Sequence, residues 1–216
     1  MAPRSETRRD FLKHASLALA LPLALGCKAD SIAIAGDGNL LAEIRANANS
    51  NPKDEWWGAR HAPPDVTWRT QLASPNDTGE KIIIRGTVYQ PDGKTPAPNT
   101  LIYLYHTDVY GKYGQDGEPR HGRYRGWMLT DVNGRYEFES IMPASYPNST
   151  IAKHIHMTVT TTDMKEDWVD SILFDGDRYL TIRDRTIVKG GFDPVMKMVK
   201  EKGGTLVGVR DIRLWV

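Results

Sequence analysis

Cysteine, net charge and long apolar runs are all scarce in this chain of 216 residues. The single cysteine is Cys27, which excludes disulfides within the chain and leaves no pair of thiolates for a metal ion. Lysine and arginine total 28 against 27 acidic residues, so no excess of charge recruits nucleic acid or an anionic membrane surface. Any metal site must therefore use oxygen and nitrogen ligands.

An apolar run at residues 15–25 is shorter than the roughly 20 residues that a membrane-spanning helix needs. It follows the motif Arg8-Arg9-Asp10-Phe11-Leu12-Lys13, and paired arginines followed by Phe and Leu are typical of twin-arginine export signals. A short buried helix is the alternative. We predict that residues 1–27 form a twin-arginine signal peptide, which directs the chain to the periplasm or the cell envelope.

The end of this segment, Leu23-Ala24-Leu25-Gly26-Cys27, resembles a lipobox, in which the cysteine is lipidated and becomes the mature N-terminus. Ala24 and Leu25 depart from the residues that the pattern prefers. Two outcomes follow from this motif. Either a lipid on Cys27 anchors the protein to a membrane, or the signal peptide is cleaved nearby without lipidation.

The rest of the chain divides into an arm and a region of short strands. Residues 28–78 are irregular apart from a helical stretch at 40–46, which predicts a tether and an N-terminal arm. Residues 79–216 hold β-rich runs at 81–88, 100–106, 126–130, 135–140, 153–162, 169–174 and 205–216. The turn at 131–134 is expected to join two of them as a hairpin, and residues 194–202 have a helix-like pattern. The fold class is therefore all-β, a β-sandwich with few short helices.

Two histidines separated by one residue, His154 and His156, stand in the strand predicted at 153–162. Side chains alternate across a strand, so both imidazoles lie on one face, about 6 to 7 Å apart along it. Such a pair can bind zinc, copper or iron, and a solvated, inert pair is the alternative. The motif by itself leaves metal binding open.

Residues 78–177 resemble the intradiol ring-cleavage dioxygenases, the catechol and protocatechuate 3,4-dioxygenase type, in the order of their motifs. The segments that carry the resemblance are Gly86-Thr87-Val88, 92–96, 101–108, Gly111-Lys112-Tyr113, 130–138, 141–147, His154-Ile155-His156 and 174–177. The resemblance implies an intradiol dioxygenase-type catalytic domain at 79–216. It also implies ferric iron, Fe(3+), as the cofactor, held by Tyr113, Tyr146, His154 and His156.

The activity implied by the resemblance is cleavage of a catechol-type ring between its two hydroxylated carbons, with O2, to a muconate-type diacid. Phenolate oxygen is a hard anionic donor that suits ferric iron. The resemblance makes Tyr146 the axial ligand that leaves the iron and accepts a proton, opposite His156, while Tyr113 and His154 stay equatorial. The expected partners are a small aromatic diol and O2. The identity of the catechol and the formation of a homo-oligomer are open.

Two positions depart from the family pattern. Ile151 stands where the family commonly has an arginine, and Ser171 stands near the place of a glutamine. Lys153 is not expected to replace the arginine, because on a strand it points away from the histidine face. His106 and Arg125 are candidate catalytic residues at the substrate pocket, and His121 and Arg123 are further sources of positive charge. The alternative for each of them is a solvated loop residue.

Two other functions fit parts of the sequence. The Gly-x-Val and Thr-Asp-x-x-Gly-x-Tyr-x-Phe patterns also resemble transthyretin-like β-sandwiches, which would make the chain a binding module without catalysis. A second alternative keeps the metal site but fills it with copper or zinc, because imidazole suits all three metals. Metal analysis distinguishes the binding module from the enzyme.

Overall fold

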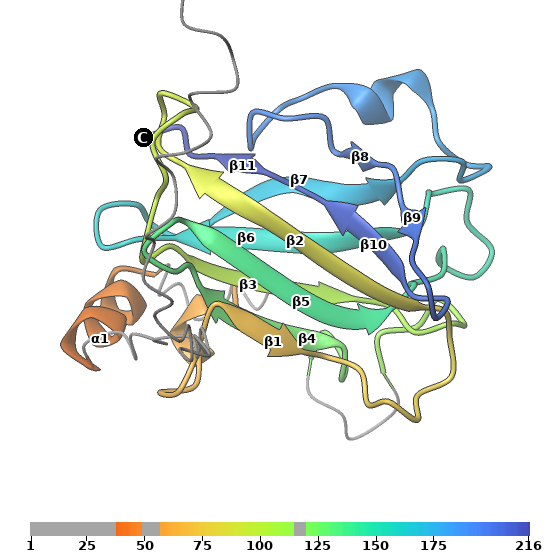
Figure 1. Cartoon of the computed structure of the whole chain (residues 1–216), viewed down its shortest axis with the longest axis horizontal. Helices are drawn as coiled ribbons and strands as arrows, with labels where there is room; N and C mark the ends of the chain where they lie inside the picture. Colours follow the sequence, from red (N-terminus) through yellow and green to blue (C-terminus); the bar gives the residue numbers. More distant parts are fainter. Residues whose placement is uncertain (1–37, 49–56, 115–119) are drawn as a thin grey trace, which may run out of the picture. The chain divides into compact units, whose positions relative to one another are not determined.

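Strands dominate the computed structural model, which describes residues 38–48, 57–114 and 120–216. The elements are α1 (Gly38–Asn47), η2 (Ala59–His61), β1 (Arg69–Gln71), β2 (Lys81–Tyr89), β3 (Leu101–His106), β4 (Arg125–Leu129), β5 (Arg135–Ile141), β6 (His154–Thr160), β7 (Asp167–Phe174), η3 (Ile182–Arg185), β8 (Val195–Met196), β9 (Val199–Lys200), β10 (Leu206–Val209) and β11 (Ile212–Arg213) (Figure 1). The twin-arginine motif, the apolar run and Cys27 lie outside the described residues. Within those residues, no helix has the length and apolar character to cross a membrane.

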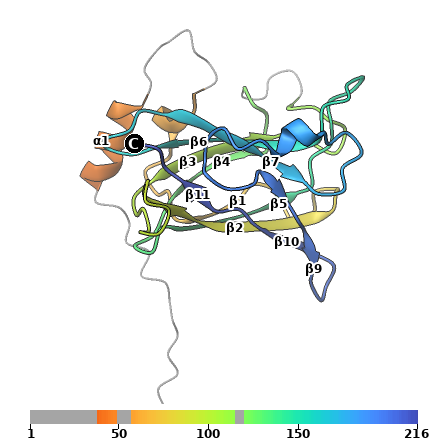
Figure 2. The ribbon, with the colours of Figure 1, turned by 90° about the horizontal axis from the view of Figure 1, so that it is seen from above.

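The strands of the described residues form two sheets that pack face to face, which confirms the predicted β-sandwich. One sheet has the order β1-β5-β2-β10-β9, with β11 paired to the end of β2. The other has the order β4-β3-β6-β7-β8. Figure 2, turned by 90°, shows the sheets as two layers.

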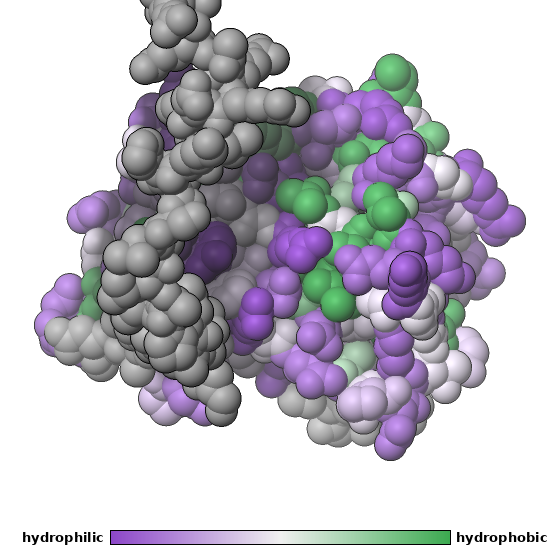
Figure 3. Space-filling view, viewed as in Figure 1, coloured by the Kyte–Doolittle hydropathy of each residue, from purple (hydrophilic) through white to green (hydrophobic). Residues whose placement is uncertain are grey.

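The core lies between the two layers. Alternate residues of β2, β5, β3, β6 and β7 point into it, among them Ile84, Phe138, Leu104, Met157 and Ile172, and all five are fully buried. Burial of each such side chain contributes about 1.5–3 kcal/mol. On the face of the first sheet seen in Figure 3, apolar residues gather over β2 and β10. Val209 of β10 and Val199 of the adjoining β9 are exposed.

The outer face of the second sheet has two distinct parts. At the start of β3, Leu101 packs with Leu41 and Ile44 of α1 and with Leu129 of β4. Further along β3, Tyr103 and Tyr105 point to this same face, because side chains two residues apart share a face of the strand. The helix predicted at 40–46 is thus confirmed as α1, and it covers one end of the face that carries the aromatic residues.

Three local predictions differ from the structure. Residues 194–202 form β8 and β9 instead of a helix, because β8 pairs with β7 and β9 with β10. The turn at 131–134 is present, but β4 and β5 belong to different sheets and do not form a hairpin. Residues 69–71, assigned to the arm, form β1 and pair with β5. In each case strand pairing overrides the local pattern.

Candidate metal centre

Four side chains bring their polar atoms to one point at an end of the second sheet. The hydroxyl of Tyr146 lies 3.0 Å from Nε2 of His154 and 3.3 Å from Nε2 of His156, and these two nitrogens are 3.0 Å apart. The hydroxyl of Tyr113 is in hydrogen-bond contact with that of Tyr146. The structure therefore brings together all four residues that the resemblance implied as iron ligands.

The two histidines are oriented and neutral. Nδ1 of His154 donates a hydrogen bond to the carbonyl oxygen of Ala152 at 2.7 Å, so its Nε2 carries a lone pair toward the cluster. Ser171 Oγ lies 3.3 Å from Nδ1 of His156. Burial lowers the pKa of His154, and burial followed by the charges of His154 and His121 lowers the pKa of His156 to about 3. Both rings are therefore available as neutral ligands at pH 7.

The spacing and chemistry of these four atoms fit a bound cation. Two donors held at about 2.1 Å from one ion, at a right angle, lie about 3.0 Å apart, which matches the separations here. The hydroxyls of Tyr113 and Tyr146 each bring an oxygen donor to the group, and Nε2 of His154 presents a lone pair to it, because Nδ1 of His154 donates to Ala152. Burial and the hydrogen bond with Tyr146 raise the pKa of Tyr113, and a cation would offset that cost.

The two tyrosines belong to the same candidate donor set as the two histidines. Among the described residues, no three His, Cys, Asp or Glu side chains gather to hold a metal. The donor atoms that the cluster offers to an ion are two imidazole nitrogens and two phenol oxygens. Such mixed oxygen and nitrogen donation suits a hard trivalent ion better than a soft one.

Two loops from different sheets carry the tyrosines, and they meet at Gly111. The loop after β3 is shaped by Asp108, whose Oδ1 accepts hydrogen bonds from the backbone N–H groups of Tyr110 and Lys112 at 2.8 and 2.9 Å. Gly111 has φ 78°, and a Cβ there would lie 2.1 Å from the carbonyl oxygen of Ser145. Only glycine permits this approach, which places the loop of Tyr113 against the loop that carries Tyr146.

Aromatic rings that the sequence analysis did not predict as site residues flank His156. The ring of Tyr105 stacks on His156 with centroids 4.8 Å apart and on His121 at 3.8 Å. Trp168 of β7 meets His156 edge-on at 5.9 Å, and Trp57 lies 5.5 Å from Trp168. The alternation of Tyr103 and Tyr105 on β3, matching that of the two histidines, was the signal that could have identified this wall.

His106 lies apart from the cluster, contrary to the expectation that it lines the pocket. It points to the sandwich interior and is fully buried, because it occupies the face of β3 opposite Tyr105. Its Nδ1 donates to the carbonyl of Thr107 at 2.7 Å, so Nε2 accepts from the hydroxyl of Ser140, also at 2.7 Å. Both ring nitrogens are thus engaged by the protein itself.

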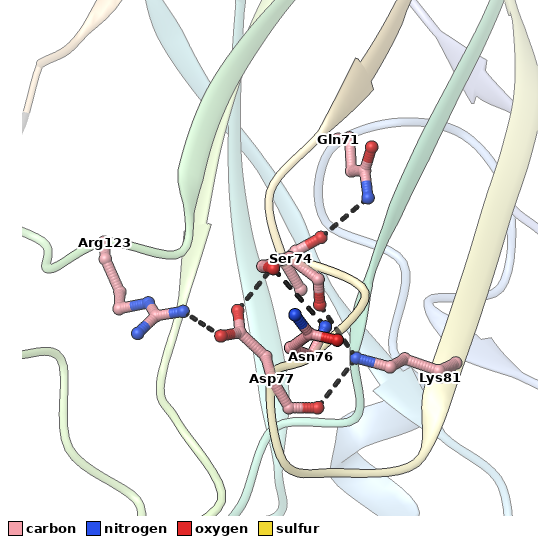
Figure 4. A network of polar contacts seen from close by, with 7 residues as sticks. Gln71, Ser74, Asn76, Asp77, Lys81 and Arg123 are labelled. Carbon is pink, nitrogen blue, oxygen red and sulfur yellow. Dashed lines mark hydrogen bonds and ion pairs between the residues drawn. The ribbon is translucent and has the colours of Figure 1, made fainter.

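The arginines next to Tyr124 have different surroundings. Arg123 forms an ion pair and a hydrogen bond with Asp77, in a network that includes Lys81, whose ammonium donates to the carbonyl oxygens of Ser74 and Asp77 (Figure 4). Arg125 begins β4, where it stands opposite Tyr105, and donates to the carbonyl of Arg120 at 2.8 Å. Arg123 therefore ties the 74–81 loop to the loop before β4, while Arg125 lines a cavity beside Tyr103.

The departures from the family pattern affect the opening beside Tyr146. Ile151 is 54 % exposed, so no charged group projects from that position. Lys153 precedes β6, which begins at His154, and the expectation from strand alternation does not apply to it. Instead Lys153 lines a cavity of about 890 Å³ together with Tyr146, Asp177 and Arg178. Tyr146 consequently borders this larger cavity, while Tyr113 borders a smaller one of about 290 Å³.

Comparisons with known proteins agree with this arrangement. The family model described as dioxygenase matches residues 57–203. The chain is 32% identical over 88 residues to a catechol 1,2-dioxygenase of Acinetobacter baylyi, covering 39% of this chain and 28% of that protein. It is 31% identical over 113 residues to a protocatechuate 3,4-dioxygenase beta chain of Burkholderia cepacia, covering 47% of this chain and 48% of that one. The chain thus spans less than half the length of either relative.

Solved structures show the same fold. The dioxygenase domain of a dioxygenase and carbohydrate-binding protein fusion from Streptomyces sp. SirexAA-E matches with a TM-score of 0.55 at 25% identity, over 71% of this chain and 92% of that one. Catechol 1,2-dioxygenase from Acinetobacter sp. ADP1 matches with a TM-score of 0.56 at 21% identity, over 69% of this chain and 57% of that one.

Proposed function

The chain belongs to the intradiol dioxygenase family, and from that premise we propose that it is a ferric-iron enzyme that cleaves a catechol-type ring between its two hydroxylated carbons. Both atoms of O2 would enter the product, a muconate-type diacid. The observation that carries the proposal is the convergence of Tyr113, Tyr146, His154 and His156 on one point.

Ferric iron, when bound by these four residues, would supply a Lewis acid that favours the doubly deprotonated catechol and makes its ring electron-rich toward O2. The side chains and backbone of the protein orient the donors and shield them. The Ala152 carbonyl holds the imidazole of His154 in the tautomer that presents Nε2. The rings of Tyr105 and Trp168 shield His156 from water.

Tyr146 is the residue suited to hold the proton taken from the catechol. Its side chain is half-buried and borders the cavity of about 890 Å³, so it has room to turn away from the other donors. Tyr113 packs against Tyr105 with ring centroids 5.5 Å apart and borders the smaller cavity of about 290 Å³. We assign the phenol oxygen of Tyr146 as the proton acceptor for one catechol hydroxyl.

Metal analysis, visible spectroscopy and oxygen uptake test this function. We expect stoichiometric iron, a red-brown colour from phenolate-to-iron charge transfer, and incorporation of both oxygen atoms from labelled O2 into the ring-opened product. Tyr146→Phe should lose or shift the colour and reduce kcat by at least about 100-fold, a typical loss for an acid–base group. Tyr110→Phe is the matched control, because Tyr110 is 73 % exposed. A protein that stays metal-free after iron reconstitution would instead indicate a binding module.

We also propose that the twin-arginine pathway exports the chain to the periplasm or envelope, where Cys27 serves as a lipid anchor. The proposal is supported by Arg8-Arg9 and the lipobox-like segment before Cys27. The double variant Arg8→Lys and Arg9→Lys should remain in the cytoplasm, as measured by cell fractionation. An unchanged distribution contradicts export by this route, and a mature N-terminus without lipid mass contradicts the anchor.

A further inference from the structure

A second cavity, of about 780 Å³, lies on the outer face of the second sheet beside Tyr103. We call it the arginine cavity. Its lining includes three arginines and three large aromatic rings, which are Arg60, Arg120, Arg125, Trp57, Tyr103 and Trp127. No Asp or Glu side chain is among the described residues that line it. A cavity of this size with aromatic walls can hold a small organic group.

Among the described residues that line the arginine cavity, the charged side chains are its three arginines. Burial, and then the charges of Arg60 and Arg125, lower the pKa of His61 in its wall. Burial, and then the charges of Arg120 and Arg125, lower the pKa of His121 to about 4, so both histidines are neutral at pH 7. A negatively charged group entering the cavity would therefore meet arginine side chains and neutral aromatic rings.

The buried carboxylate of Glu166 supports one wall of the arginine cavity. Glu166 is 3 % exposed, and its oxygens accept hydrogen bonds from the backbone N–H groups of Gly58 and Ala59 and from the hydroxyl of Thr158. These bonds hold the turn of η2, from which Arg60 extends, against β6. Glu166 thus fixes one wall of the arginine cavity from beneath.

Stacked rings lie between the arginine cavity and the candidate metal centre. His121 in its wall stacks on Tyr105, and Tyr105 stacks on His156. Trp57 in its wall lies beside Trp168, which meets His156 edge-on. Because Arg125 and His156 both stand opposite Tyr105, on the strands to either side of β3, their backbones are about 10 Å apart.

On the basis of the proposed ring cleavage, we propose that the arginine cavity binds a carboxylate carried by the substrate, so that the enzyme selects catechols with an acidic side arm. Arg125 and Arg60 are the specificity-determining residues. The carboxylate must reach past Tyr105 from a ring held at the metal centre. An arm of two or three atoms between ring and carboxylate therefore suits the distance better than a carboxylate attached directly to the ring.

The test compares an acid with its neutral ester on the iron-loaded enzyme. The probes are 3,4-dihydroxycinnamate and its methyl ester, with 3,4-dihydroxybenzoate and catechol as shorter analogues. We expect the ratio of kcat/KM for the acid to that for the ester to fall by about tenfold or more in Arg125→Gln and in Arg60→Gln, mainly through KM, because a charge-assisted hydrogen bond is lost. Arg125→Lys keeps the charge and should retain most of the ratio.

Two further variants locate the effect. Arg135→Gln removes an arginine that pairs with Asp131, away from the arginine cavity, and should leave the ratio unchanged. Arg178→Gln removes the arginine beside Tyr146. A ratio that falls in Arg178→Gln but not in Arg125→Gln or Arg60→Gln overturns the proposal and places the carboxylate in the other cavity.

The remaining outcomes separate this inference from the proposed function. If the wild type turns over catechols with a kcat/KM ratio of acid to ester near 1, the proposed specificity is overturned and ring cleavage is not affected. The same holds if neither Arg125→Gln nor Arg60→Gln changes that ratio. Absence of turnover of every catechol by protein that contains stoichiometric iron overturns the proposed function, and the specificity with it.

Discussion

Two buried histidines of this chain show how the partners of a side chain decide its role. His106 and His154 each donate Nδ1–H to a backbone carbonyl, of Thr107 and Ala152 respectively. Nε2 of His106 then accepts a hydrogen bond from Ser140, whereas Nε2 of His154 faces Tyr146 and His156. The first imidazole is satisfied within the core, and the second presents an unprotonated nitrogen to a candidate metal ion.

His106 makes the stability of the protein dependent on pH. Burial lowers its pKa to about 4, while in the unfolded chain the pKa is about 6.5. Between these values the unfolded state binds a proton that the folded state does not. The contribution of neutral His106 to the free energy of unfolding is fully present above about pH 6.5 and is lost as the pH falls through about 4. The loss amounts to at most about 1.4 kcal/mol per pH unit.

Urea denaturation of the metal-free protein at pH 7 and pH 5 measures this dependence. The free energy of unfolding should fall more between the two values in the wild type than in His106→Gln, which does not titrate. His61→Gln is the control, because His61 is exposed and its replacement removes less of the dependence. Equal pH dependence in the wild type and His106→Gln would refute the assignment.

At the scale of elements, the metal centre depends on the meeting of two loops that belong to different sheets. Tyr113 follows β3 of the second sheet, and Tyr146 follows β5 of the first. The histidines stand at the start of β6, which pairs with β3. Strand pairing positions the histidines relative to Tyr105, but the contact between the loops at Gly111 brings the phenol oxygens to them.

Gly111→Ala should separate these loops. The added Cβ would lie 2.1 Å from the backbone oxygen of Ser145, and φ of 78° strains any other residue. We expect loss of most of the bound iron and of the visible colour, while the far-ultraviolet circular dichroism of the sandwich is retained. Gly203→Ala is the matched control, because Gly203 also has positive φ but no atom lies within 4 Å of its added Cβ. Full iron occupancy in Gly111→Ala would show that the loops meet without this contact.

For the whole molecule, a bound ion would link the two layers of the sandwich at one end. Its donors come from the segment after β3, the segment after β5 and the start of β6, which together belong to both sheets. A ligand that binds the folded state and not the unfolded state stabilises the fold according to its concentration and affinity. The metal centre is therefore expected to contribute to stability as well as to catalysis.

Removal of iron by a chelator should lower the unfolding temperature, and return of iron should restore it. At a free iron concentration 100 times the dissociation constant, the stabilisation is about 2.7 kcal/mol, which corresponds to several degrees for a domain of this size. Differential scanning calorimetry measures the change. In Tyr113→Phe combined with Tyr146→Phe, the same treatment should have little effect. An equal shift in that variant would place the stabilising iron elsewhere.

The sequence by itself predicted the short strands and the sandwich, because alternation and turn chemistry are local properties. The four candidate donors were implied by the order of motifs that resembles the family. The sequence also predicted α1. Local patterns misassigned residues 194–202 and the 131–134 hairpin, since strand pairing and the division of the strands between two sheets decide them.

The tertiary structure alone decided the surroundings of the donors. It placed His106 in the core, tied Arg123 to Asp77, and set Tyr105 and Trp168 around His156. It also formed the arginine cavity, in which Arg60 and Arg125 lie together although they are more than 60 positions apart in the sequence. Such neighbours arise from how the sheets and loops pack. That packing balances contacts along the whole chain against the conformational entropy of the chain. No single segment therefore encodes the packing.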